Sequence, residues 1–348
     1  MKLAVVAALL ALLVDHAPAE ACATAPPRGA EARVADEEAV IIWDAAGKRE
    51  TFIRRARFHS TAKQFGFLVP TPTKPELGEV DVGVFQKLAE LIRPEVVVDE
   101  SGTEVEVASL ITSCTKGDKK SKSADGVAAP AVRVIQSAHV AGLDATTVAA
   151  DDPKALADWL GSHGFESTPQ LEAWLGIYTQ QRWMITAFVI GGDAGERAMY
   201  DVATKAVKMT FATDVPFYPY REPEQKDLDP PELALPPRML RVFFVSDQRY
   251  TGKGWSASTL YSAAVQLPGE LWSVKGNDRL TVFIDDASPR IAKDEVFFAP
   301  HTDQSEVKQP PLVVHRPRRI QIPLEAVAFA SILVLLLIVR RQRKKHAA

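Results

Sequence analysis

The stretch EEAVIIWDAAGKRETFIRRARF, residues 37–58, decides the fold expected for this chain. Two extended runs, 37–43 and 50–58, flank the turn-rich DAAGK, and this pattern predicts a β-hairpin. Side chains alternate between the faces of a strand, so one face of the second run should be half-buried and the other polar. The expected faces are Phe52, Arg54, Ala56 and Phe58 on one side, and Arg55 and Arg57 on the other.

The sequence after the hairpin favours further strands and one helix. QFGFLVPTPTKPEL, residues 64–77, should be a strand that leads into an extended proline-rich loop, because proline cannot donate to a β-ladder. Apolar residues at helical spacing between 84 and 92 predict a helix closed by Pro94. Short apolar runs at 96–98 and 105–110 favour strands again.

The middle of the chain predicts a pair of helices between strands. In residues 151–165 Asp152 is expected to be an N-cap followed by proline at the first helical position. In residues 167–181 Ser167 and Gln170 have the spacing of a capping box. The apolar stripe of the second helix is Leu171, Trp174, Leu175 and Tyr178. Together with the strands, the pair predicts an α+β fold rich in antiparallel sheets.

Composition changes along the chain suggest a division into segments. The expected segments are a signal peptide at 1–21, an N-terminal β-rich domain at 22–114, a flexible linker at 115–130, an α+β domain at 131–222, a proline-rich connection at 223–240, a β-rich segment at 241–308, a Pro/Arg stalk at 309–323, a transmembrane helix at 324–339 and a basic cytoplasmic tail at 340–348. The linker TKGDKKSKSADGVAAP holds no large apolar residue and cannot contribute to a core.

The N-terminal residues have the pattern of a secretory signal peptide. Lys2 precedes an apolar stretch at 3–14, and small residues then offer cleavage after Ala19 or Ala21. A positive start, a short apolar centre and an A-x-A end define such a signal. We therefore expect the chain to be exported, with these residues removed.

The C-terminal residues predict a membrane anchor. The uncharged run at 326–339 spans about 21 Å as a helix, and extension back to Ile320 gives 20 residues, enough for a hydrocarbon core of about 30 Å. Five cations follow at once, as in a stop-transfer sequence: Arg340, Arg341, Arg343, Lys344 and Lys345. We expect a single-pass type I protein that contacts membrane lipid through one C-terminal transmembrane helix and keeps its C-terminus in the cytoplasm.

Charge and cysteine content limit which binding partners and which cellular compartment we expect. The formal charge is −3, and it becomes about −8 when the five C-terminal cations are left out. An acidic ectodomain lacks the basic surface that phosphate backbones require, so we expect no nucleic-acid partner. The two cysteines, Cys22 and Cys114, both fall in the exported part, and an even count there predicts a disulfide between them. Two free thiols are the alternative.

Motifs for known chemistry do not emerge from the sequence. It holds no H-E-x-x-H, no C-x-x-C and no glycine-rich phosphate loop. GWSAS at 254–258 resembles a nucleophile elbow but lacks the closing glycine. Asp285 and Asp286 are more typical of a turn than of a calcium loop, which needs further oxygen ligands. We therefore predict no catalytic, cofactor-binding or metal-binding residues.

Several blocks resemble one known family. They are the helix-pair region at 140–190, FGFLVPTPTKPEL, DVPFYPYR at 214–221 and LTVFIDDASPRIAKDEVFF at 280–298. These blocks are similar to an uncharacterised family of exported bacterial proteins, the domain-of-unknown-function family 2330. Members tend to begin with two nearby cysteines, whereas Ala21-Cys22-Ala23-Thr24 has one, and this difference strengthens the pairing of Cys22 with Cys114. The resemblance implies a bacterial envelope protein and transfers no catalytic residue.

Two functions from different classes follow as expectations. The first is a non-enzymatic cell-envelope protein, anchored in the membrane, whose periplasmic or extracellular part binds an envelope protein or a cell-wall partner. The second is an extracytoplasmic hydrolase with an active site that no motif reveals. A C-terminus that acts as a processing signal is a further alternative, although no sorting motif precedes it.

Overall fold

The computed structural model describes residues 22–99, 101, 103–106, 133–191, 200–224, 238–267, 269, 274, 276, 278–287, 292–316, 318–321 and 334–341. The chain divides into two compact units, Met1–Arg93 with Ser121–Gln309, and Pro94–Lys120 with Pro310–Ala348. The expected signal peptide at 1–21 and the expected linker at 115–130 lie outside the described residues. The fold is α+β and rich in antiparallel sheets, as the sequence predicts.

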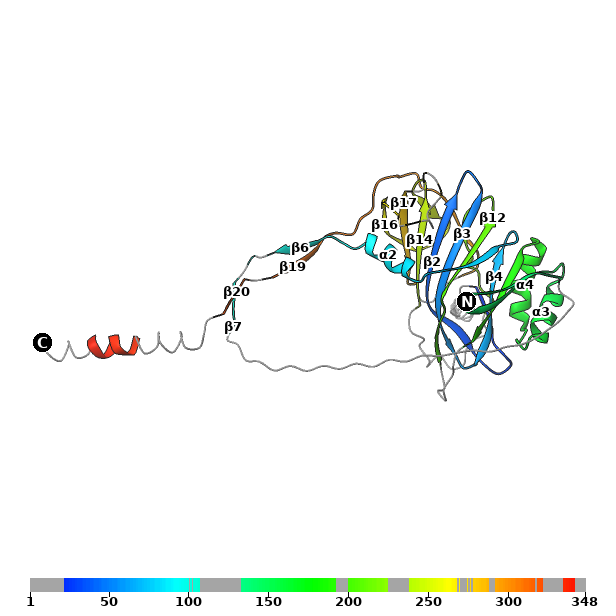
Figure 1. Ribbon diagram of the computed structural model, residues 1–348, viewed down its shortest axis with the longest axis horizontal. Helices are drawn as coiled ribbons and strands as arrows, with labels where there is room; N and C mark the ends of the chain where they lie inside the picture. Colours follow the sequence, from blue (N-terminus) through cyan, green and yellow to red (C-terminus); the bar gives the residue numbers. More distant parts are fainter. Residues whose placement is uncertain are drawn as a thin grey trace, which may run out of the picture. The chain divides into compact units, whose positions relative to one another are not determined.

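The largest sheet is built around the hairpin at residues 37–58 (Figure 1). β2 (Ala32–Asp44) and β3 (Arg49–Ser60) pair antiparallel, which confirms that prediction. This eight-stranded sheet has the order β16-β17-β14-β2-β3-β12-β5, with β11 also paired to β3. Its other strands are β16 (Ser258–Ala264), β17 (Arg279–Asp285), β14 (Met239–Ser246), β12 (Ala206–Ala212), β5 (Glu76–Val80) and β11 (Tyr200–Ala203).

One pair in the eight-stranded sheet is parallel and joins distant parts of the chain. β14 runs alongside β2 from Met239 opposite Asp36 to Val245 opposite Ile42. Figure 1 shows these two strands side by side in the centre of the sheet. The segments expected at 22–114, 131–222 and 241–308 all contribute strands to this one sheet.

A β-bulge in β2 sets which side chains face the interior. The register shifts between Val34 and Asp36, so Ala35 is an extra residue without a partner on β3. Alternation changes phase at this point, because one inserted residue moves all later side chains to the opposite face. The buried residues on the inner face are Ala32, Val34, Glu37, Ala39, Ile41 and Trp43.

The two faces of β3 are those predicted from its alternation. Phe52, Ala56 and Phe58 lie in the interior core, and Arg54 is buried beside them. On the other face Arg55 forms an ion pair with Glu38 and Arg57 forms one with Asp36.

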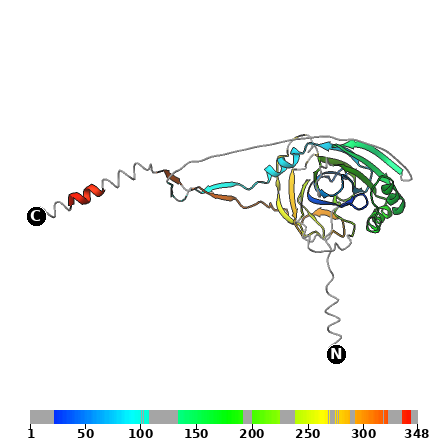
Figure 2. The ribbon, with the colours of Figure 1, turned by 90° about the horizontal axis from the view of Figure 1, so that it is seen from below.

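A five-stranded antiparallel sheet lies across the main core from the eight-stranded sheet (Figure 2). Its order is β1-β4-β10-β9-β8, and its central pair joins β4 to β10 over eight residue pairs. The strands are β1 (Ala23–Ala25), β4 (Gln64–Thr71), β10 (Met184–Gly191), β9 (Leu143–Ala149) and β8 (Arg133–Val140). The main core draws apolar residues from both sheets.

Helices cover the outer side of each sheet. α3 (Pro153–Ser162) and α4 (Pro169–Gln180) form a second core with the five-stranded sheet, in which Trp174 and Leu175 pack with residues such as Leu68 and Ile185. α2 (Gly83–Leu91) packs on the eight-stranded sheet through a third core that includes Phe85 and Phe243 (Figures 1 and 2). The predicted apolar stripe of α4 is buried throughout.

The two helices of the pair begin with side-chain caps. Asp152 accepts hydrogen bonds from two backbone N–H groups of α3, as predicted. The N-cap of α4 is Thr168, which accepts from the N–H of Leu171, so the predicted capping box of Ser167 and Gln170 is wrong by one position. The proline after Thr168 occupies the first helical position and fixes the start there.

A small third sheet completes the first unit. β18 (Val296–Pro300) pairs antiparallel with β13 (Phe217–Tyr218) on one side and with β15 (Tyr250–Gly252) on the other. It brings Phe217, Tyr250 and Phe298 into the main core.

The second unit contains two parallel strand pairs. β6 (Val96–Asp99) pairs with β19 (Leu312–His315), and β7 (Thr103–Glu106) pairs with β20 (Arg318–Gln321). A short helical stretch occupies residues 334–341. Among the residues that the structure describes, no helix combines the length and the apolar character needed to cross a membrane.

The parallel pair of β2 and β14 makes the first unit depend on the chain beyond residue 236. A chain that ends there keeps β2 but loses β14, so Val40 and Ile42 lose the neighbours Phe243 and Val245 with which they share a core. We expect this truncated chain to aggregate and to show no cooperative unfolding transition in urea, because an unpaired apolar strand edge is exposed. A chain that ends at residue 309 should keep the transition. Cooperative unfolding of the shorter chain would contradict this prediction.

Candidate functional site

The segment Phe217–Arg221 crosses the interior and is held by four acidic side chains. Glu37 belongs to β2, Glu50 to β3, Asp285 to β17, and Glu295 precedes β18. Two backbone N–H groups donate: that of Phe217 to Glu50 Oε2 at 2.8 Å, and that of Arg221 to Glu295 Oε2 at 3.1 Å. Two hydroxyl groups also donate: that of Tyr218 to Glu37 Oε1, and that of Tyr220 to Asp285 Oδ2 at 2.7 Å. Each carboxylate comes from a different element, so this segment ties these elements together.

A buried ion pair lies at the centre of the main core. Arg54 Nε donates to the same Glu37 oxygen that accepts from Tyr218. The guanidinium carbon of Arg54 also lies 3.9 Å from the centre of the Phe67 ring, a cation–π contact. Burial alone would lower the pKa of Arg54, but the Glu37 carboxylate raises it above its ordinary value. Burial and the charge of Glu37 raise the pKa of Tyr218, so its hydroxyl stays a hydrogen-bond donor.

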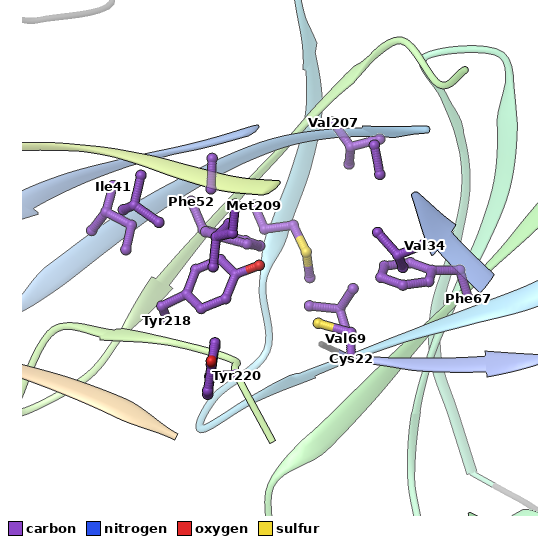
Figure 3. Close-up of a cluster of buried hydrophobic side chains, with 14 of the residues drawn as sticks. Cys22, Val34, Ile41, Phe52, Phe67, Val69, Val207, Met209, Tyr218 and Tyr220 are labelled. Carbon is purple, nitrogen blue, oxygen red and sulfur yellow. The ribbon is translucent and has the colours of Figure 1, made fainter. Parts of the chain in front are cut away.

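Cys22 lies in the same core, near Val69, as Figure 3 shows. Its side chain is buried, and its thiol donates to the carbonyl of Pro219 at 3.2 Å. Burial raises the pKa of this thiol well above its ordinary value, which keeps it protonated and unreactive. Cys22 is a free cysteine here, so the disulfide expected with Cys114 is not found; Cys114 itself lies outside the described residues.

The interior cluster is a structural feature and not a ligand site. The cavity beside Arg54 has a volume of about 20 Å³ and is lined mainly by aromatic and aliphatic side chains. A space of roughly 10–15 Å³ accommodates a single water molecule, so this cavity is too small for a metabolite.

A larger pocket opens between α4 and the chain before β18. Its volume is about 230 Å³. The lining residues are Ile177, Tyr178 and Gln181 from α4 and the residue after it, Arg221 from the segment Phe217–Arg221, and Asp294, Glu295 and Phe297 from β18 and the turn before it. We call this the Glu295 pocket.

Hydrogen bonds hold the Glu295 carboxylate on both of its oxygens. The hydroxyl of Tyr178 donates to Oε1, and the N–H of Arg221 donates to Oε2. Burial raises the pKa of Glu295, and these two donors counter part of the shift. Burial and the neighbouring Glu295 charge also raise the pKa of Tyr178. These hydrogen bonds fix the Glu295 carboxyl and the Tyr178 hydroxyl in the wall of the pocket.

The remaining polar groups of the pocket carry balanced charges. Arg221 Nη2 donates to Asp294 Oδ1 at 2.5 Å, and the Asp294 side chain is 82% exposed. Gln181 is exposed just after the end of α4, and Phe297, which also lines the pocket, is 38% exposed. The pocket thus offers hydrogen-bonding groups beside an aromatic plane.

The other residues singled out in the sequence fall into structural roles. Asp285 is buried and accepts from Tyr220 and from Trp255 Nε1, as an internal acceptor would. No cluster of three or more metal-ligating side chains occurs within the described ranges. Of the predicted anchor cations, Arg340 and Arg341 lie in the helical stretch at 334–341, whereas Arg343, Lys344 and Lys345 lie outside the described residues.

Comparison with known proteins places the chain in a family. Residues 16–236 match the family described as an uncharacterized protein conserved in bacteria (DUF2330), which covers more than half of the chain. The chain therefore belongs to this family, and the resemblance noted in its sequence is confirmed. No curated protein and no solved structure matches it.

Removal of one partner from the buried ion pair should destabilise the fold strongly. Arg54→Met leaves Glu37 charged in the core, and we expect a loss of about 3–5 kcal/mol in the free energy of unfolding. Arg57 lies on the same strand as Arg54 and forms a half-exposed ion pair with Asp36 of β2. Its substitution, Arg57→Met, should lower the free energy of unfolding by less than about 1 kcal/mol. Urea titrations of the two variants measure the difference, and equal losses would contradict the assignment.

Glu50 should contribute to the pH dependence of stability. It is 0% exposed, and burial raises its pKa well above the ordinary 4.5, against the hydrogen bond from Phe217. The folded chain therefore retains a proton that the unfolded chain releases, so stability is full below about pH 4.5 and is lost as pH rises toward the folded-state pKa.

Glu50→Gln cannot ionise, and its amide oxygen can still accept from Phe217. We expect unfolding free energies measured between pH 4 and pH 8 to fall less with pH than in the parent chain. Glu31→Gln, at an exposed position, should leave the slope unchanged. A slope unaltered by Glu50→Gln would show that Glu50 is ionised in the folded chain.

Proposed function

We propose that the protein is a membrane-anchored component of the bacterial cell envelope that binds a partner through the Glu295 pocket. The observation that carries the proposal is the pocket itself, which is large enough for a small group and combines an exposed ring with accessible polar side chains. Membership of a bacterial family, the signal-like N-terminus and the apolar C-terminal run support the envelope location.

The geometry of the pocket favours binding over catalysis. A general acid or base must reach the proton that it transfers, with a free oxygen within hydrogen-bond distance of the ligand. Both oxygens of Glu295 are already engaged by Tyr178 and Arg221. Asp294 is exposed and already forms an ion pair with Arg221, so its carboxylate is engaged as well.

An extracytoplasmic hydrolase is the second candidate. The observation in its favour is the raised pKa of Glu295, a carboxyl in a pocket, because perturbed acids gather at active sites. Under this reading Glu295→Gln abolishes turnover and leaves ligand binding in place. Under the binding proposal the same variant has no turnover to lose.

Site-specific photocrosslinking in intact cells tests the proposal. A photoreactive amino acid at position 177, a half-buried residue that lines the pocket, should give a discrete adduct that sediments with membranes after an alkaline carbonate wash. The same amino acid at Lys154, an exposed position on α3 that does not line the pocket, should give none.

Two controls separate the parts of the proposal. A chain that ends at residue 321 lacks the apolar run and should be lost from the membrane pellet. The Phe297→Ala variant should give no adduct but should stay in the membrane pellet. Equal adducts from both positions would refute the pocket as the binding site. A full-length chain recovered in the wash would refute the anchor.

A further inference from the structure

We infer that the ligand of the Glu295 pocket is an uncharged saccharide, bound with one sugar ring against Phe297 and with hydroxyl groups on Gln181, Asp294 and Arg221. This inference rests on the proposed binding function and names the chemical class of its partner. It depends on three properties of the pocket: its charge balance, its aromatic surface and its size.

The charge balance favours a neutral ligand. Arg221 and Asp294 neutralise each other across 2.5 Å, and the Glu295 carboxyl is enclosed by its two donors. A charged ligand would have to break the Arg221–Asp294 ion pair, or its own charge would have no opposite charge in the pocket to neutralise it. A hydroxyl group can instead donate to the exposed Asp294 carboxylate or accept from the guanidinium while the pair stays intact.

The aromatic surface favours a ring with an apolar face. Phe297 points out of β18 with 38% of its surface exposed, and the Phe217 ring supports it at 5.9 Å between centroids. A sugar ring presents C–H groups on one face and hydroxyls around its edge, so it can cover the phenyl plane and reach the polar wall at the same time. A purely apolar ligand would form no hydrogen bond with Gln181 or with the Arg221–Asp294 pair.

The size of the pocket sets the length of ligand that it encloses. Pockets for drug-sized molecules span about 300–1,000 Å³, whereas this one has about 230 Å³. It therefore encloses a single ring, and the rest of a longer glycan would extend over the exposed surface.

Calorimetric titration of the purified full-length chain in detergent tests the inference. The probes are three neutral tetrasaccharides, of N-acetylglucosamine, β-linked glucose and α-linked glucose, and a charged tetramer of galacturonic acid. We expect saturable binding of at least one neutral probe and at least tenfold weaker binding of the charged one. Failure of all neutral probes, or tighter binding of the galacturonate, would overturn the inference.

Substitutions locate the binding in the pocket. Phe297→Ala should weaken the neutral probe at least tenfold, and Phe297→Trp should retain it, since the larger ring keeps an aromatic plane. Gln181→Ala should also weaken it, whereas Met239→Ala, at an exposed apolar residue outside the pocket, should not. Unchanged affinity in Phe297→Ala would overturn the assignment even if a saccharide binds elsewhere.

The titration and the crosslinking fail in distinguishable ways. If no neutral saccharide binds but the adduct from position 177 still depends on Phe297, the saccharide inference is wrong and the binding function stands. If the adduct is also absent, both are wrong.

Discussion

The first unit depends on the hydrogen bonds by which four acidic side chains hold the segment Phe217–Arg221. Without them this short length of chain would place three N–H or hydroxyl donors in an apolar core, and each unsatisfied group costs about 1–3 kcal/mol. The carboxylates come from β2, β3, β17 and the turn before β18, and Trp174 of α4 adds a hydrogen bond to the carbonyl of Arg221. The segment is thus the point where the eight-stranded sheet, the small sheet and the helix pair meet.

This arrangement also explains why the interior contains charge at all. Buried ions are costly, and a core of apolar residues of equal volume would often be as stable. Here Arg54 and the Tyr218 hydroxyl both donate to one oxygen of Glu37, so the position of each group depends on the other two. At its far end the same segment presents Arg221 to the Glu295 pocket, and the register fixed in the core therefore sets the position of a pocket residue.

The sequence predicted those features that depend on local patterns. The hairpin, the faces of β3, the first cap of the helix pair and its apolar stripe follow from alternation, capping chemistry and helical period. The interior cluster does not follow, because Glu37 and its partner Tyr218 are 181 positions apart along the chain. The Glu295 pocket is likewise formed by three segments that are at least 40 positions apart along the chain, which only the folded topology brings together. The pairing of β2 with β14 is non-local for the same reason.

The parallel pairing of β2 and β14 has a consequence for the order of events during synthesis. Ribosomes add about 5–20 residues per second, so on the order of 10–40 s pass between the appearance of β2 and that of its second neighbour. Throughout this interval the β2 edge of the hairpin lacks its second neighbour and is a template for aberrant pairing with another strand. The edge of β2 therefore stays open to aberrant strand pairing until nearly three quarters of the chain has been made.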